Sequence, residues 1–242
     1  MIKDSIRIDQ EQLEVQLDVM LQMQNALNRL VIPDWRQKAL AWHRAIYVEA
    51  AEYLEHLGSW KWWKKGTPNF PQANMELVDI WHFGLSWYLA NRLTGTTLSR
   101  MSEIERLGLI NIMSNDILAA NSYEPLSKAE PIANEQRHVA VDELVAAAGA
   151  KKFSMSAFVR LLAYSGMSFD MLYQRYIGKN VLNRFRQEHG YKTGEYVKTW
   201  AGLEDNEHLD RLLAELPADI SLPDRVHAGL TALYANATKA QA

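Results

Sequence analysis

The sequence lacks cysteine altogether, and it has no long apolar run and no excess of one charge. Without cysteine among its 242 residues, the chain can form neither a disulfide framework nor a thiolate metal site. No stretch of about 18 apolar residues predicts a membrane span, and the polar, acidic N-terminus does not resemble a signal peptide. A net charge of −3 gives no general reason to expect nucleic acid or an anionic membrane as partner. We therefore expect a cytoplasmic protein with neither partner.

Three further patterns are missing, and their absence favours an all-α fold. No segment alternates apolar and polar residues as strands do, no glycine motif for a nucleotide is present, and no internal repeat is visible. We predict a multi-helix bundle, with one domain over residues 1–242 that could contain a second helical lobe inserted around residues 94–150. The predicted helices span residues 10–31, 37–57, 71–94, 96–120, 134–148, 154–165 and 168–189, with two more after residue 204 that Pro217 and Pro223 interrupt.

The ends of several predicted helices carry capping residues. Asp9, Ser154 and Ser168 precede apolar helical patterns and are expected N-caps. Gly58 is the expected C-cap of the second helix, and Pro71 suits the first turn of the third.

Two of these helices each carry a pair of carboxylates at the same spacing. Glu49 and Glu52 lie on the second helix, and Glu76 and Asp79 lie on the third. Positions three apart share one face of a helix, so each pair directs two carboxylates the same way. Each pair is therefore half of a site for a cation.

The third helix, MELVDIWHFGLSWYL, is apolar nearly all round, which is typical of a buried helix. Buried anions are unfavourable unless they are compensated, and converging carboxylates are best compensated by a hard divalent cation. The pattern predicts a magnesium cluster, although four acids alone are equally compatible with salt-bridged helix surfaces. His82 of this helix is better explained as a hydrogen-bonded core histidine, because Mg²⁺ prefers oxygen ligands.

Polar and aromatic residues elsewhere suit a planar, anionic ligand. Gln24 and Asn28 are neighbours on the apolar face of the first helix, where an isolated pair would more often be satisfied core amides. The loop SWKWWKKGTPNFP places lysines between Trp60, Trp62 and Trp63, which could be core anchors or stack on a ligand.

A second dense group of polar residues follows in YIGKNVLNRFRQEHGYKTGEYVKTW. Three of them share one helix face and three lie on the exit loop, and together they could hold a polyphosphate or form a solvated basic surface. They are Lys179, Asn183 and Arg186 on the helix, and Tyr191, Lys192 and Lys198 on the loop.

These segments resemble the dimeric dUTPase branch of the all-α NTP pyrophosphatase superfamily. The resemblance is carried by ELVDIWHF, by Trp60-Lys61-x-Trp63-Lys64, by Gln24 with Asn28, and above all by YIGKNVLNRFRQEHGYKTGEYVKTWAGLEDN. It extends from about residue 17 to about residue 213 and is weakest over residues 94–150. It implies a homodimeric, Mg²⁺-dependent enzyme that converts dUTP, and dUDP, to dUMP, with water attacking the β-phosphorus.

The resemblance also implies roles for individual residues. Glu49, Glu52, Glu76 and Asp79 would hold magnesium, with Glu49 and Glu52 as the catalytic pair and Glu49 favoured as the base. The uracil and deoxyribose would meet Gln24, Asn28 and Phe83, with Phe83 clashing with a ribose 2′-hydroxyl, and Trp60 and then Trp63 forming a wall. The phosphates would meet Lys179, Asn183, Arg186, Tyr191, Lys192 and Lys198.

One departure and two alternatives stay open from the sequence. The segment EHLGSWKWWK is a residue longer than the expected loop, which leaves open which tryptophan faces the base. The first alternative is a housecleaning pyrophosphatase for other deoxynucleotides such as dCTP. The second is a non-catalytic helical scaffold, which would not need all four acids.

Overall fold

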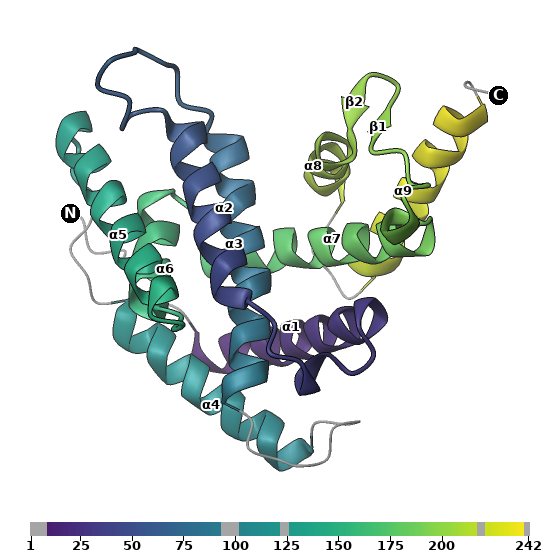
Figure 1. Cartoon of the computed structure of the whole chain (residues 1–242), viewed down its shortest axis with the longest axis horizontal. Coiled ribbons are helices and arrows are strands. Elements are labelled where there is room, and N and C mark those ends of the chain that lie inside the picture. The colour runs from purple at the N-terminus through teal and green to yellow at the C-terminus, as the bar shows by residue number, and fades with distance from the viewer. Residues whose placement is uncertain (1–8, 93–101, 122–125, 217–220, 240–242) are drawn as a thin grey trace.

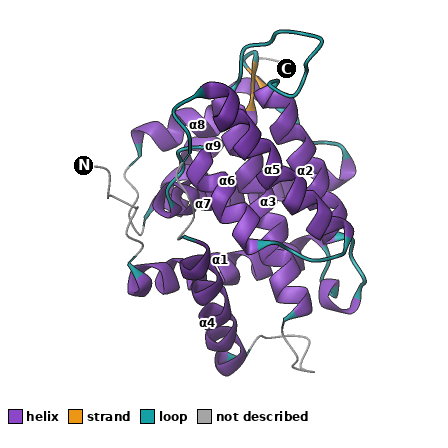
Figure 2. Ribbon diagram, turned by 90° about the vertical axis from the view of Figure 1, so that its left-hand side faces the viewer, coloured by secondary structure: helices purple, strands orange, loops and turns teal. Residues whose placement is uncertain are grey.

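The structure is a computed structural model that describes residues 9–92, 102–121, 126–216 and 221–239. For residues 237–239 it describes the backbone only. Within these ranges it is almost entirely helical, with one short hairpin and two single 3-10 turns (Figures 1 and 2). The α-helices are α1 (Gln10–Val31), α2 (Trp42–Leu57), α3 (Phe70–Asn91), α4 (Glu103–Ala120), α5 (Glu130–Gly149), α6 (Met155–Tyr164), α7 (Phe169–Glu188), α8 (Asp205–Glu215) and α9 (Leu222–Lys239). The 3-10 turns are η1 (Trp35–Gln37) and η2 (Tyr191–Thr193), and the hairpin pairs β1 (Thr199–Trp200) with β2 (Leu203–Glu204) in antiparallel register.

The helices form two groups that α7 connects. On one side α2 packs against α3 and α5, and α6 packs against α4 and α5. On the other side α8 and α9 pack against α7 and against each other, while α1 contacts α3, α4 and α7 (Figure 1). The all-α prediction is confirmed. The inserted lobe around residues 94–150 stays a prediction. Helices α4 and α5, which lie in this range, both pack against other helices of the bundle.

Most helix ends lie where the capping residues predicted them. The side chains of Asp9, Ser154 and Ser168 each accept a hydrogen bond from a backbone N–H in the first turn. Gly58 ends α2 with φ +63°, a left-handed conformation that a residue without Cβ adopts freely. The ends predicted near Thr94, over residues 96–101 and at Pro217 lie outside the described residues.

Three predicted boundaries are wrong, each for a local reason. The second helix begins at Trp42 instead of residue 37, because residues 35–37 form the separate turn η1. Helix α5 begins at Glu130, four residues earlier than predicted, with Pro131 in its first turn. Helix α9 begins at Leu222 and includes Pro223 in its first turn, where the sequence predicted an interruption. A proline is tolerated there since the missing N–H has no partner within the helix.

Helix α3 is buried on nearly all sides and fixes the position of the acids it carries. Trp81 stacks on Phe158 with ring centroids 5.1 Å apart, and Phe153 packs against the bare Cα of Gly84. A Cβ at Gly84 would lie 2.8 Å from the Phe153 ring, so only glycine permits this approach. No described helix is long and apolar enough to cross a membrane.

Candidate functional site

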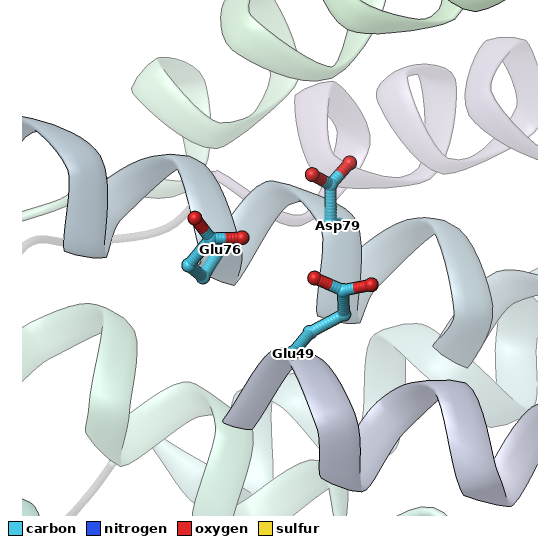
Figure 3. Close-up of side chains that lie close together, drawn as sticks. All are labelled: Glu49, Glu76 and Asp79. Carbon is cyan, nitrogen blue, oxygen red and sulfur yellow. The ribbon is translucent and has the colours of Figure 1, made fainter. Parts of the chain in front are cut away.

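Three carboxylates meet where α2 faces α3. Glu49 comes from α2, and Glu76 and Asp79 come from successive turns of α3; the three side chains lie close together (Figure 3). One carboxylate oxygen from each residue lies within 4.8 Å of the others. This arrangement supplies the oxygen ligands that a hard divalent cation prefers.

Glu52, the fourth predicted ligand, is not part of this group of three. Its side chain lies one turn further along α2 and is exposed. Its charge nevertheless raises the pKa of both Glu49 and Glu76, so it lies near the cluster. The structure therefore brings three of the four acids together and places the fourth at the edge.

The cluster is electrostatically unfavourable when all of its acids are ionised. Burial, followed by the charges of Asp79 and Glu52, raises the pKa of Glu49 from 4.5 to about 8. Burial and Asp79 likewise raise the pKa of Glu76 to about 7, although the nearby Lys179 opposes this shift. A hydrogen bond joins the carboxyl groups of Glu49 and Glu76, which requires a shared proton.

Basic side chains contact two of the three acids. The Nζ atom of Lys179, which is almost fully buried, lies 2.9 Å from Asp79 and also donates to Asn206 of α8 over 3.1 Å. The Nε2 atom of His56 lies 3.2 Å from Glu76. Lys179 thus links the acidic cluster on α3 to the C-terminal helices.

A cavity of about 260 Å³ opens next to Asp79, which is part of its wall. It lies between α1, η1, α3 and the C-terminal end of α7. The predicted base, sugar and phosphate residues that line it are Gln24, Asn28, Phe83, Asn183, Arg186 and Tyr191. Trp35, Trp42 and His82 also line the cavity.

A buried hydrogen-bond network holds the two amides of α1. The Ser86 hydroxyl donates to the His82 carbonyl over 2.9 Å and lies 3.0 Å from the nitrogens of both Gln24 and Asn28. Gln24 also donates to Asn28 Oδ1 and accepts from Tyr176, each over 3.0 Å. The amide hydrogens of Gln24 are therefore both used within the protein. Among the described residues Asn28 keeps one N–H and one lone pair, because Ser86 Oγ, 3.4 Å from Asn28 Oδ1, gives its hydrogen to the nearer His82 carbonyl.

Arg186 is held by a buried partner that the sequence analysis did not name. Its guanidinium makes two hydrogen bonds of 2.8 Å to Asp205, whose side chain has no exposed surface. Burial raises the pKa of Asp205, but Arg186 and the hydroxyl of Tyr196 outweigh it and hold that pKa below its ordinary value. Arg186 also donates to Asn183 over 3.0 Å and lies over the ring of Tyr191.

The two predicted lysines on the exit loop do not line the cavity in this structure. Lys192 donates to the carbonyl of Val31 at the end of α1 over 3.2 Å. Lys198 forms an exposed ion pair with Glu204 over 3.0 Å. Neither forms a hydrogen bond or ion pair with Glu49, Glu76 or Asp79 among the described residues.

The tryptophan loop also lies away from the cavity. Trp60, Trp62 and Trp63 are exposed and pack edge to face on one another. Trp60 faces the N-terminal half of α5 and lines a separate hollow there. In this structure the aromatic wall next to Phe83 is Trp42, with ring centroids 6.4 Å apart, so the prediction for Trp60 and Trp63 stays untested.

The comparison with family models decides the class of the chain. A model described as dUTPase matches residues 16–191, which is most of the sequence. The chain belongs to the dUTPase family. The resemblance found in the sequence is thereby confirmed, and the family's activity identifies a hydrolase that acts on dUTP. The comparison with curated proteins gave no match.

The match covers every residue that lines the cavity of this dUTPase, and it includes the three clustered acids. It ends at residue 191, before Lys192, Lys198 and Asp205. No role was predicted for Asp205 and Asn206, although they are the last two residues of the C-terminal block that carried the resemblance. His82, too, was predicted only as a core residue, while its position three residues after Asp79 placed it on the same helix face.

Proposed function

We propose that the chain is an Mg²⁺-dependent hydrolase that converts dUTP, and dUDP, to dUMP. The observation that carries this proposal is the group of three carboxylates beside a cavity that contains amides, aromatic rings and Arg186. The size of the cavity, its hydrogen-bond donors and its charges suit a nucleotide, with the base and sugar inside and the charged phosphate chain beside the acids.

The donor set of the cluster fits magnesium. Each of the three acids offers a carboxylate oxygen, and the raised pKa values of Glu49 and Glu76 mean that the ionised cluster needs a cation. Glu49, Glu76 and Asp79 would hold it, with Glu52 at the edge. When bound, the ion supplies Lewis-acid polarisation of the phosphate oxygens and lowers the pKa of water.

The residues of the chain account for the remaining requirements of the reaction. Glu49, the acid with the most strongly raised pKa, is the base that removes a proton from the attacking water. Water attacks the β-phosphorus, the α–β anhydride bond breaks, and dUMP and pyrophosphate (phosphate from dUDP) are the products. Arg186 and Lys179 neutralise the charge that develops on the phosphates as this bond breaks, and Asn183 and Tyr191 donate hydrogen bonds to the same phosphates. Lys192 and Lys198 of the exit loop would supply further positive charge to the same phosphates, but only if their side chains leave the partners that they have in this structure.

The wall opposite the phosphate side selects the nucleoside. Asn28 keeps one donor and one acceptor for the base, and Phe83 leaves no room for a 2′-hydroxyl on the sugar. A pocket that pairs polar edges discriminates strongly against ligands that leave its groups unpaired. Gln24 acts here by orienting Asn28, since its own hydrogens are used.

The direct test is pyrophosphate release from all common nucleoside triphosphates, with and without Mg²⁺. We expect release from dUTP in magnesium, none in EDTA, and none from Glu49→Gln, whose circular dichroism should remain that of a helical protein. Glu55→Gln is the matched control, because Glu55 lies on the same helix and pairs with Lys61 away from the cluster. Comparable rates on every triphosphate would favour a housecleaning pyrophosphatase. No release and no nucleotide binding would favour a scaffold.

We also propose that the enzyme is a homodimer in the cytoplasm. Helix α3 uses its apolar surface within the chain, whereas α4 exposes Ile104, Leu107 and Ile112 on one side. An exposed apolar helix face of this kind is suited to a second copy, because a two-fold interface presents the same surface twice. Light scattering of the purified protein tests the oligomeric state.

A further inference from the structure

One ring nitrogen of His82 has no hydrogen-bond partner in the part of the chain that the structure describes. The side chain is almost fully buried, stacks on Tyr176 with ring centroids 4.3 Å apart, and lines the cavity between Gln24 and Phe83. Its Nδ1 atom lies 2.7 Å from the Oε1 atom of Gln24. Its Nε2 atom is buried and has no hydrogen-bond partner among the described residues. Buried polar atoms in native proteins nearly always have a partner, so this one points to a ligand.

The network around Ser86 decides which ring nitrogen carries the proton. The Ser86 hydroxyl has one hydrogen and two acceptors within reach, the His82 carbonyl at 2.9 Å and Asn28 Oδ1 at 3.4 Å, and it donates to the nearer carbonyl. The Ser86 oxygen must then accept from neighbouring amides. The amide nitrogens of Gln24 and Asn28 therefore both face Ser86, at 3.0 Å each. The oxygen of Gln24 consequently faces His82, where it also lies 3.0 Å from the Tyr176 hydroxyl, whose one hydrogen is shared between Gln24 and the Met20 carbonyl.

This orientation leaves only one tautomer for His82. Because Gln24 Oε1 can only accept, the Nδ1 atom of His82 must donate to it and must carry the hydrogen. A neutral imidazole then has a lone pair on Nε2. The cavity therefore contains a fixed, buried acceptor that needs an N–H or O–H group from whatever fills it.

We propose that the Nε2 atom of His82 accepts the N3–H hydrogen bond of the pyrimidine base, and that this contact makes the site select uracil over cytosine. The proposal rests on the proposed function. Uracil carries a hydrogen on N3, whereas cytosine has a lone pair at the same position. Cytosine would therefore place one lone pair against another inside a buried cavity and leave both unpaired, which is unfavourable.

Gln24 and Ser86 act as positioning residues in this scheme. They do not contact the base; they hold the His82 ring in the tautomer that reads it. Gln24, which the resemblance assigned to the base, thus acts indirectly, by orienting the His82 ring whose Nε2 atom contacts the base. Asn28, with one free donor and one free acceptor, remains available for a carbonyl of the base.

The test compares kcat/KM for dUTP and dCTP in wild type and in His82→Gln. A glutamine side chain can present either an oxygen or an N–H, so the dUTP:dCTP ratio should fall at least tenfold, with dCTP turnover unchanged or higher. His208→Gln replaces another buried histidine, one that bonds to the Trp200 carbonyl outside the cavity, and should keep the wild-type ratio. A purely structural role for His82 would lower turnover of both substrates by one factor, and that result would overturn the proposal.

A second measurement uses only the unaltered protein, so it holds even if His82→Gln does not fold. Binding of dUMP, dCMP and N3-methyl-dUMP is measured by calorimetry in magnesium. We expect dUMP to bind at least tenfold more tightly than either of the others, because only dUMP offers a hydrogen at N3. Equal affinities would overturn the role of His82. Absence of dUTP hydrolysis with selective dUMP binding would instead contradict the proposed reaction and leave the base contact standing.

Discussion

Glu49→Gln should stabilise the metal-free protein while it abolishes turnover. The pKa of Glu49 is raised from 4.5 to about 8, so the folded state holds a proton that the unfolded state releases above its ordinary pKa. The contribution of this carboxyl to stability is therefore complete below about pH 4.5 and declines as pH rises toward about 8. Glutamine is neutral at every pH, keeps the shape of the side chain, and can still donate to Glu76.

The gain in unfolding free energy from Glu49→Gln follows from the pKa shift of Glu49. We reduce it because Glu49 is partly exposed and because the acids of the cluster share their charge. Each pKa unit corresponds to about 1.4 kcal/mol, and we expect about 3 kcal/mol after this reduction. For a chain of this size that raises Tm by about 6–12 °C. The difference should be present at pH 8 in EDTA and should vanish near pH 4.5, where wild-type Glu49 is protonated as well.

Thermal unfolding followed by circular dichroism checks this prediction, with Glu55→Gln as the exposed control on the same helix. Saturating Mg²⁺ should raise the Tm of wild type, since a ligand at a hundred times its Kd adds about 2.7 kcal/mol, and should raise that of Glu49→Gln much less. If Glu49→Gln unfolds at the wild-type temperature in EDTA at pH 8, the argument from the acidic cluster is wrong.

Three further predictions concern other parts of the molecule. Arg186→Ala should destabilise the fold by about 3 kcal/mol, because it leaves the buried Asp205 carboxylate unpaired, and Arg186→Ala with Asp205→Ala should recover part of this in urea titrations; equal stability of all three variants would refute the pairing. Trp42→Ala should raise KM for dUTP about tenfold by removing a cavity wall, whereas Trp62→Ala, at a position 89% exposed, should leave KM unchanged; the reverse order would return the base wall to the tryptophan loop. Ile112→Asp should halve the mass seen by light scattering if α4 forms the dimer interface, and an unchanged mass would place that interface elsewhere.

The parts of the site that sequence predicted well are those set by local geometry. Glu76 and Asp79 are three residues apart on one helix, so their common face follows from helical periodicity alone. The apolar surroundings in the sequence correctly predicted that α3 is buried. Glu52 shows the limit of this reasoning, because residues three apart differ in direction enough for Glu49 to point inward while Glu52 remains exposed.

The parts that sequence did not predict depend on contacts between distant segments. Asp205 pairs with Arg186 across a turn, a 3-10 helix and a hairpin, and no spacing rule relates them. Ser86 meets Gln24 only because α1 packs against α3. For His82 the expectation of a hydrogen-bonded core histidine was half right: one nitrogen is bonded within the protein, and the other has no partner among the described residues, in a side chain that lines a cavity formed only on folding.

The direct connection of α2 to α3 has a consequence for the order of folding. The three clustered acids come from neighbouring helices joined by one loop, so their group can assemble from contacts that are close in sequence (Figure 1). Contacts of short sequence separation form fast because little loop entropy is lost. The cavity, in contrast, needs α7 to reach α1, about 150 residues away, as the bond from Tyr176 to Met20 illustrates. The metal-binding half of the site can therefore assemble before the half that recognises the base, and magnesium could stabilise a helical hairpin that is not yet able to bind nucleotide.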